Sequence, residues 1–236
     1  MRAVILAGGK GRRLFPYTVV IPKPLVPMGD KSILEIVVRQ LKRHQFRHLT
    51  MAVGYQAELI MALMGNGSKW GLQIDYSMES EPLGTIGPLR EIESLHEPFL
   101  VMNGDLLCDI DYRQLMETHR SNGCIATVAT CKQHVQLQLG VLRYDEQCRL
   151  TGFEEKPAFD YDVSMGIYVF DPRVCEYIPK QGPFGFDQLI HALLKAGEPV
   201  AVYPFDGHWL DIGTHEDLDN ALREFEANRE RYLPDD

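Results

Sequence analysis

The chain has 236 residues, 45% of them hydrophobic, and a formal net charge of −9. This length and composition suit one globular domain that spans residues 1–236. The negative charge excludes a general attraction for nucleic acid or for an anionic membrane, so an anionic substrate would have to be held by a local cluster of cations.

Neither a membrane segment nor a disulfide framework is expected. No stretch approaches the roughly 20 apolar residues that a membrane span needs. The five cysteines are odd in number and include no CxxC pair, which favours free thiols in a reducing compartment. We therefore expect a cytoplasmic protein.

The first predicted element is a buried strand at residues 4–6 that runs into a glycine-rich turn. The turn, residues 8–13, has the sequence GGKGRR. Its glycines have no β-carbon, so backbone N–H groups can close on an anion, and its arginines stay charged at any working pH. A glycine follows the lysine where a P-loop needs serine or threonine, and Leu14 stands where a dinucleotide fingerprint needs its third glycine. The turn predicts a polyphosphate site of neither common type; the alternative is a tight loop that only closes the strand.

A second candidate phosphate ligand, Lys23, follows this turn. Pro22 and Pro24 fix their own φ angles and favour extended backbone at the residues that precede them. A lysine held in this way can direct its ammonium group to one point at low entropic cost. We interpret Lys23 as a phosphate clamp, the alternative being an ordinary solvated loop lysine.

Strand and helix patterns alternate through the first half of the chain. Ser32 and Glu35 form a capping box before a helix whose apolar stripe ends at Leu41. The next elements are predicted strands at 49–53, 74–78 and 99–102, and predicted helices at 57–64, 85–95 and 112–120. Such alternation is typical of an α/β sheet with crossover helices.

The second half of the chain is richer in strands. Strands are predicted at 125–131, 140–144, 150–154, 163–170 and 200–205, and helices at 186–195 and 216–227. A β-rich subregion of this kind is expected to extend the sheet and to overhang its carboxyl edge. Ligands bind beyond the carboxyl ends of strands in open α/β sheets, so the loops after Leu6, Met102 and Phe205 should face one cleft.

Two aspartates lie at predicted strand ends and suit a metal ion. Asp105 follows an apolar strand, and Asp211 follows a Trp-Leu pair. Mg²⁺ commonly takes one or two carboxylates together with substrate phosphates and water, so the two side chains would form a site if the fold brings them together. The alternatives are a loop-capping turn residue for Asp105 and an Asx turn for Asp211.

The sequence Glu-Glu-Lys-Pro at residues 154–157 places two acids and a base where a proline ends a strand. A glutamate can accept hydrogen bonds from sugar hydroxyls, and a lysine can hold a phosphate as a point charge. The segment is a candidate sugar-phosphate site, the alternative being a solvated charged turn.

Taken together, these motifs resemble the sugar-1-phosphate nucleotidyltransferases, or NDP-sugar pyrophosphorylases. The matching segments follow the family's order over nearly the whole chain: LAGGKGRRL, PKPLVP, EPLGTIG, NGD, FEEKP, MGIY and WLDIGT. The resemblance implies one Rossmann-like α/β domain with a mixed, mostly parallel sheet, divided into a nucleotide-binding part (1–120), a β-rich sugar-binding part (121–215) and a C-terminal helix (216–230). It also implies nucleotidyl transfer from an NTP to a sugar 1-phosphate, with Mg²⁺ held by Asp105 and Asp211.

The resemblance assigns roles residue by residue. Lys23 corresponds to a lysine that contacts phosphates at the reacting centre, and Lys156 to one that holds the sugar phosphate. The implied catalytic residues are Arg13, Lys23, Asp105 and Asp211. The implied nucleotide-binding residues are Leu6, Ala7, Gly8, Gly9, Gly11, Arg12, Arg13, Glu79, Gly84 and Asp105. The implied sugar-phosphate-binding residues are Lys23, Gly140, Glu155, Lys156 and Ser164.

Two positions depart from the family pattern. Arg12 stands where threonine is usual, so it either adds a cation to the triphosphate site or points to solvent. Leu139 stands where an aromatic residue is common, which argues against stacking on the sugar there. The segment EPLGTIG resembles the EPLGTAG of mannose- and heptose-1-phosphate guanylyltransferases more than the thymidylyl or cytidylyl versions. GTP is therefore favoured, with UTP and dTTP left open.

Two other classes of protein remain as alternatives. A non-catalytic NDP-sugar-binding regulatory protein would be expected to lose the aspartates or Lys23, and the sequence keeps all of them. A nicotinamide oxidoreductase is disfavoured by Leu14. The expected partners are an NTP and a sugar 1-phosphate, without nucleic acid or membrane, and a homodimer is left open.

Overall fold

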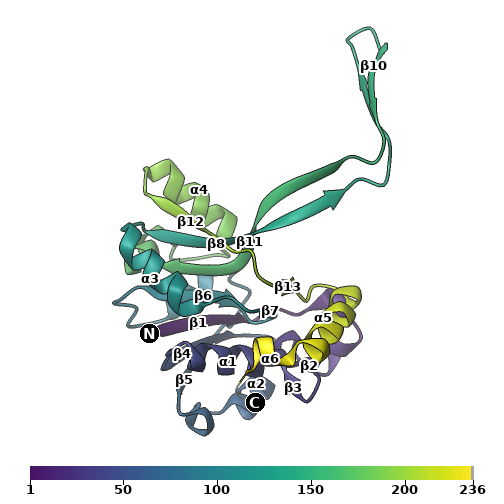
Figure 1. Cartoon of the computed structure of the whole chain (residues 1–236). Coiled ribbons are helices and arrows are strands. Elements are labelled where there is room, and N and C mark those ends of the chain that lie inside the picture. Colours follow the sequence, from purple (N-terminus) through teal and green to yellow (C-terminus); the bar gives the residue numbers. More distant parts are fainter. Residues whose placement is uncertain (235–236) are drawn as a thin grey trace.

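The computed structural model describes residues 1–234, whose centre is a seven-stranded sheet (Figure 1). The strand order is β12-β8-β11-β6-β1-β4-β5. The strands are β1 (Arg2–Ala7), β4 (His48–Val53), β5 (Gln73–Met78), β6 (Phe99–Asn103), β8 (Ala126–Gln136), β11 (Ala158–Phe170) and β12 (Val200–Pro204). Strand β11 runs antiparallel to β6 and β8, and the other neighbours are parallel. The mixed, mostly parallel α/β sheet is thereby confirmed.

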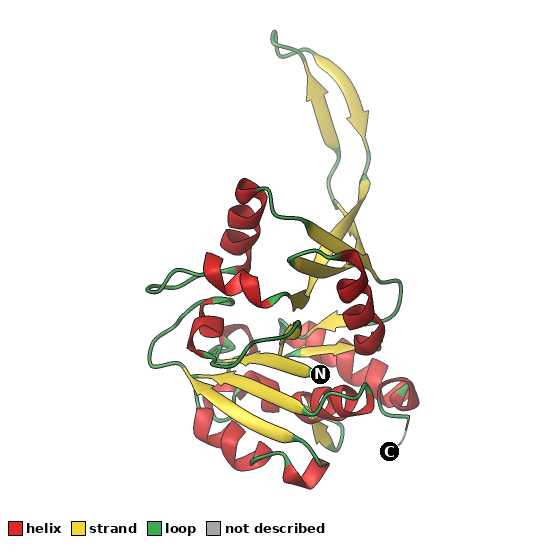
Figure 2. Ribbon diagram, turned by 90° about the vertical axis from the view of Figure 1, so that its left-hand side faces the viewer, coloured by secondary structure: helices red, strands yellow, loops and turns green. Residues whose placement is uncertain are grey.

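Helices cover both faces of this sheet (Figure 2). The α-helices are α1 (Ile33–Arg43), α2 (Ala57–Met64), α3 (Tyr112–Asn122), α4 (Phe186–Ala196), α5 (His215–Ala227) and α6 (Arg229–Tyr232). Alternate residues of β1 pack into different clusters, Ala3 and Ile5 on one face and Val4 on the other. The central strand is therefore buried on both sides, which explains its unbroken apolar sequence. None of the described helices is long and apolar enough to cross a bilayer.

Two predicted helices need correction. Helix α1 begins after Ser32 as predicted, and Ser32 Oγ accepts from the Glu35 backbone N–H at 3.2 Å. The Glu35 carboxylate accepts from Arg39 instead of completing the predicted capping box. The predicted helix at 85–95 is instead a short 3₁₀ turn, η5 (Gly87–Glu91), which ends at the extended residue Ile92. The N–H groups of Ile86 and Gly87 donate to the Phe184 carbonyl at 2.9 and 3.0 Å. The predicted C-terminal helix at 216–230 is divided into α5 and α6 at Asn228.

The β-rich half differs from the prediction in its placement. Strands β8 and β11 extend the central sheet, but β9 (Val141–Tyr144) and β10 (Leu150–Glu154) pair only with each other as a separate two-stranded sheet. We call residues 137–157 the arm. Both views show the arm standing clear of the rest of the molecule (Figures 1 and 2). Its strands therefore do not add to the sheet as expected.

Short elements complete the fold and position loops. Strand β7 (Leu106–Cys108) pairs antiparallel with β13 (Trp209–Asp211), and β2 (Pro27–Met28) pairs with β3 (Lys31–Ser32). The remaining 3₁₀ turns are η1 (Arg12–Leu14), η2 (Tyr17–Val19), η3 (Lys23–Leu25), η4 (Ser68–Trp70) and η6 (Pro172–Tyr177). Strands of two or three residues carry no clear periodicity, and the sequence did not predict the β7–β13 pair.

Candidate active site

The glycine-rich turn follows the carboxyl end of β1. Gly11 adopts the left-handed conformation with φ +59° and begins η1. A β-carbon on Gly8 would lie 2.3 Å from Oε1 of Glu79, so the Glu79 side chain already fills that space. A β-carbon on Gly9 would meet no heavy atom within 4 Å. The turn therefore leaves open space beside Gly9, where its backbone can approach a ligand.

Glu79 lies at the end of β5 and faces this turn. Burial raises the pKa of its carboxyl group, while the hydrogen bond that Oε2 accepts from the Leu83 backbone N–H at 3.2 Å opposes the rise. Gly84, further along the same loop, has φ +80°, and a β-carbon there would lie 2.6 Å from the Phe184 carbonyl oxygen. The loop is thus held by the Leu83–Glu79 hydrogen bond and by the close approach of Gly84 to the Phe184 backbone.

Lys23 is 8% exposed and lies among carboxylates. Its ammonium group forms an ion pair with Oδ2 of Asp105 and lies 3.9 Å from Oδ1 of Asp211. The extended backbone predicted at Lys23 is wrong: the residue opens η3, which is fixed by a 2.8 Å hydrogen bond from Leu25 N–H to the Pro22 carbonyl. The lysine is held as a phosphate clamp requires, but by a different local structure.

The β7–β13 pair brings together two aspartates that are far apart in the sequence. Asp211 is paired with Leu106, the residue after Asp105, and the Ile212 N–H donates to the Asp105 carbonyl at 3.3 Å. Burial and then the negative charge of Asp105 raise the pKa of Asp211, and the charges of Lys23 and Arg13 lower it. Asp211 ends β13, a strand end as the sequence indicated, although the pairing of that strand with β7 was not predicted.

Arg13 lies on the same side of the molecule. A β-carbon on Gly213 would lie 3.1 Å from Nη1 of Arg13, so the guanidinium packs over the backbone just after Asp211. Arg12, the first residue of η1, is exposed, as is Arg13. The structure therefore brings Arg13, Lys23, Asp105 and Asp211 together at the end of the glycine-rich turn.

The two aspartates fit a divalent cation. Oδ1 of Asp105 is buried without a hydrogen-bond partner, although Oδ2 is occupied by Lys23. No group of three or more His, Cys, Asp or Glu side chains that could hold a metal occurs within residues 1–234. A cation here would take two carboxylates from the protein and its other ligands from elsewhere, as Mg²⁺ does with phosphate oxygens and water.

Three of the predicted sugar-phosphate residues lie in the arm rather than beside this cluster. Gly140 and Glu155 are neighbours, because a β-carbon on Gly140 would lie 3.2 Å from Oε2 of Glu155. Lys156 is exposed and has a left-handed backbone with φ +46°. Ser164 lies outside the arm, at the register shift of β11, and donates to the Tyr168 hydroxyl at 3.3 Å. The structure separates the arm residues from Lys23 and the aspartates.

Thr18 is a supporting residue that the sequence did not indicate. It is buried, and its hydroxyl donates to the Gly11 carbonyl at 3.0 Å. A β-carbon on Gly11 would lie 2.8 Å from its methyl group. Thr18 therefore fixes the far end of the glycine-rich turn, and no local motif around a single threonine could have identified this role.

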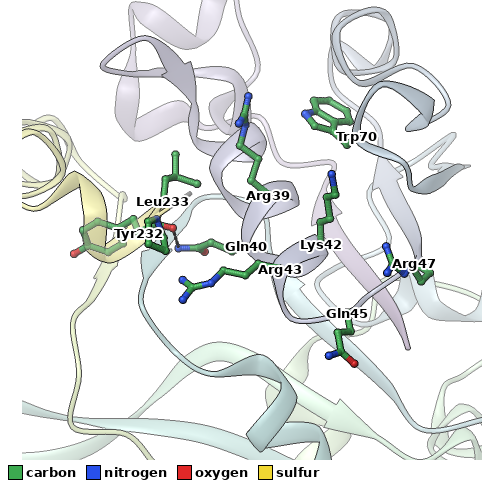
Figure 3. A pocket seen from close by; sticks show the side chains of 10 residues that line it. Arg39, Gln40, Lys42, Arg43, Gln45, Arg47, Trp70, Tyr232 and Leu233 are labelled. Atoms are coloured by element: carbon green, nitrogen blue, oxygen red, sulfur yellow. Dashed lines mark hydrogen bonds between the residues drawn. The ribbon is translucent and has the colours of Figure 1, made fainter. Parts of the chain in front are cut away.

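A separate pocket of about 360 Å³ lies between the C-terminal end of α1 and the segment after α6 (Figure 3). Lys42, Arg43 and Arg47 contribute to its lining. Gln40 closes its base by donating to the Tyr232 carbonyl at 3.3 Å. Cations in the last turn of a helix stabilise its dipole, which accounts for Lys42 and Arg43 without a ligand.

Comparison with known proteins identifies relatives over nearly the whole chain. A family model described as Nucleotidyl transferase matches residues 2–228. UTP–glucose-1-phosphate uridylyltransferase of Synechocystis is 33% identical, with 94% of this chain and 63% of that protein covered. Mannose-1-phosphate guanylyltransferase catalytic subunit beta of Drosophila pseudoobscura is 35% identical, with 92% and 60% covered. The chain thus spans between 60% and 63% of the length of these curated relatives.

Two solved structures share the fold. A putative glucose-1-phosphate thymidylyltransferase from Bacillus anthracis has a TM-score of 0.76 and 25% identity, with 94% of each chain covered. HddC from Yersinia pseudotuberculosis, complexed with GMP-PN, has a TM-score of 0.73 and 25% identity, with 95% of this chain and 99% of that chain covered. Both likenesses extend over nearly the whole chain.

Proposed function

Since the chain belongs to the nucleotidyl transferase family, we propose that it transfers a nucleotidyl group from an NTP to a sugar 1-phosphate and releases pyrophosphate. The observation that carries the proposal is the cluster of Lys23, Asp105 and Asp211 beside the glycine-rich turn. Relatives named as uridylyl- and guanylyltransferases of sugar 1-phosphates support the same reaction class. The five cysteines, all free, support a cytoplasmic location.

The chemistry needs positive charge more than it needs a base. An oxygen of the sugar phosphate attacks the α-phosphorus of the NTP, and the bond from that phosphorus to the leaving pyrophosphate breaks. Both reactants are anions, and each pair of unit charges at 4 Å repels by about 4 kcal/mol at an effective dielectric constant of 20. The phosphate oxygen is already a nucleophile, so catalysis rests on in-line positioning and electrostatic stabilisation.

The chain's own residues divide this work. Backbone N–H groups of the glycine-rich turn and the guanidinium of Arg13 hold the triphosphate, and Lys23 directs its charge to the reacting phosphates. Asp105 and Asp211 would hold Mg²⁺, which supplies further neutralisation of the triphosphate when bound. Glu79 and Gly84 border the nucleoside side. Lys156, with Glu155, Gly140 and Ser164, binds the sugar phosphate.

We further propose GTP as the nucleotide. The segment from Glu81 to Gly87 has the sequence EPLGTIG, which resembles that of guanylyltransferases, and mannose-1-phosphate guanylyltransferases are among the relatives at 31–35% identity. UTP and dTTP are the alternatives, supported by the uridylyltransferase relative and the thymidylyltransferase structure.

A matrix of five NTPs against a panel of sugar 1-phosphates, assayed by pyrophosphate release, tests both proposals. Turnover confined to GTP is expected, and the panel identifies the sugar. Turnover with UTP or dTTP alone would overturn the nucleotide assignment and keep the reaction class. Tight calorimetric binding of an NDP-sugar without turnover in any combination would show a regulatory binding protein instead.

A further inference from the structure

The arm is an ordered hairpin with a well-defined turn. Oδ1 of Asp145 accepts from the backbone N–H groups of Gln147 and Arg149, both at 3.0 Å. Arg149 also forms an ion pair with Asp145 at 2.8 Å. Hydrogen bonds close the other end, where the Leu137 N–H donates to the Pro157 carbonyl at 3.0 Å. The arm is therefore a structured element and not a loose loop.

One face of the arm is apolar and lies in solvent. Leu142 is paired with Phe153, and Tyr144 with Leu150. The register shift between Leu150 and Gly152 places both of these pairs on one side of the hairpin. The four side chains are 57–70% exposed.

The opposite face of the arm is polar, since it carries Arg143 and Glu154, whose charged groups lie 3.9 Å apart. An isolated two-stranded hairpin is at best marginally stable in water, and a contiguous exposed apolar face marks an interaction surface. The difference between the two faces indicates that the apolar one is covered in the working protein.

The arm's own domain is poorly placed to cover this face. Strands β8 and β11 pair without a break from Ser164 with Thr130 to Ala158 with Gln136, and this ladder leads the arm away from the sheet (Figures 1 and 2). Folding the arm back onto its own domain would require a sharp bend at the end of this ladder. A partner molecule can cover the apolar face without any movement of the arm.

The chain carries a second exposed apolar surface, at the edge of the candidate active site. We call Phe15, Tyr17, Val19 and Val20 the rim; their side chains are 52–69% exposed. The rim directly follows the glycine-rich turn, and the His215 ring holds it through the Phe15 carbonyl at 2.7 Å. Thr18, within the rim segment, is the residue that contacts Gly11. A surface covering the rim would therefore lie beside the bound triphosphate.

We infer that two copies of the chain exchange arms: the apolar face of each arm docks on the rim of the other copy and brings Glu155 and Lys156 to that copy's active site. One two-fold operation covers both exposed surfaces of both copies, as a self-complementary interface requires. It also supplies a lysine to a cluster whose own Lys23 is paired with carboxylates. The inference rests on the proposed function for the role of Lys156, but the docking of the arm stands on the surfaces alone.

Complementation between two inactive variants tests the shared site. We call the rest of the described chain, residues 1–136 and 158–234, the body. Lys23→Ala disables the body and Lys156→Ala disables the arm. Co-expression with two different tags and sequential affinity purification isolates the heterodimer. If arms are exchanged, one of its two sites receives an intact body and an intact arm, so activity at subsaturating sugar 1-phosphate should reach about half that of the wild type. Alone, Lys23→Ala should retain roughly 0.1% of this activity, and Lys156→Ala about 3% or less.

Two results would overturn the exchange. A heterodimer no more active than its parent variants would show that each arm serves its own body. A fully active wild-type protein with the mass of a single chain, 26.9 kDa, would show that no second copy is needed.

A physical measurement separates this inference from the proposed function. The double variant Leu142→Ser, Phe153→Ser removes apolar side chains from the arm, and light scattering should show its mass fall from twice 26.9 kDa to 26.9 kDa. Arg143→Ser, on the polar face of the same strand, is the matched control and should remain dimeric. An unchanged dimer in the double variant would refute docking through this face, whatever the wild-type turnover. Absence of turnover in a wild-type dimer that the double variant dissociates would refute the proposed function alone.

Discussion

The body and the arm each present a lysine followed by proline, and the structure treats the two lysines in opposite ways. Lys23 is 8% exposed and its charge is paired with Asp105. Lys156 is exposed, has φ +46°, and makes no ion pair among residues 1–234. A lysine buried among carboxylates is positioned before a ligand arrives, whereas an exposed lysine needs a ligand or a second molecule to hold it. The body thus holds its lysine in place before a phosphate binds, whereas the lysine of the arm is held only once a ligand or a second molecule binds.

The largest effect should come from the body. Lys23→Ala should lower kcat by about 10³-fold, a loss of the size seen when one preorganised group that stabilises the transition state is removed. It also leaves Asp105 and Asp211 side by side without their cation, which should raise the pKa of Asp211 further because Lys23 now lowers it. Pyrophosphate release measures the change, and circular dichroism checks the fold.

Lys10→Ala is the matched control for this variant, because Lys10 is an exposed lysine of the same glycine-rich turn. It should change kcat by less than about tenfold, since exposed charges contribute roughly 0–1 kcal/mol. Equal losses in the two variants would mean that burial does not distinguish Lys23, and the contrast between body and arm would fail.

Lys156→Ala should affect a different kinetic constant. We expect KM for the sugar 1-phosphate to rise by about 30-fold or more, the loss of roughly 2 kcal/mol of a charged contact, while KM for the NTP stays unchanged. Lys132→Ala, an exposed lysine on β8 at the base of the arm, is the control. Steady-state kinetics in both substrates separates the outcomes. A rise in KM for the NTP instead would mean that Lys156 contacts the NTP and not the sugar 1-phosphate.

The elements that the sequence predicted well are those with a local signal. The alternating apolar strands and helices of the sheet, and the Ser32 cap of α1, follow from periodicity and side chains a few residues apart. The glycine-rich turn was also predicted, because its glycines can be recognised directly in the sequence. These features determine where β1 ends and therefore where the candidate site lies.

The features that the sequence could not predict depend on contacts between distant segments. Asp211 reaches Asp105 through the β7–β13 pair, whose three-residue strands have no periodic pattern. The segment 85–95 forms only the short turn η5, whose first N–H groups donate to the distant Phe184 carbonyl and whose end at Ile92 is extended. Strands β9 and β10 were predicted correctly as strands, but an apolar face does not say which surface covers it. The sequence therefore predicted the strands and the glycine-rich turn, but it did not predict where the arm lies.

Within the body, two adjacent glycines should separate stability from binding. Gly8→Ala places a methyl group 2.3 Å from Oε1 of Glu79, so the carboxylate must shift away from the Leu83 N–H. We expect a loss of about 0.5–1.5 kcal/mol in unfolding free energy, the net contribution of one hydrogen bond. Gly9→Ala meets nothing within 4 Å and should leave the unfolding free energy unchanged while weakening NTP binding about tenfold. Urea unfolding and NTP titration measure the two quantities. Normal NTP binding by Gly9→Ala would show that the triphosphate does not approach this backbone.

The smallest effect should come from Arg12, which is exposed although it belongs to the body. Arg13 packs over Gly213, and its charge lowers the pKa of Asp211, whereas no residue among 1–234 fixes the Arg12 side chain in a comparable way. Arg12→Ala should therefore raise KM for the NTP by only about two- to fivefold, within the 0–1 kcal/mol of an exposed charge. The effect should shrink as ionic strength rises and the Debye length falls. A larger loss that persists at high salt would mean that Arg12 moves to contact the triphosphate when the NTP binds. The body would then also contain a cation that is positioned only by its ligand, and the difference between body and arm would be smaller than proposed.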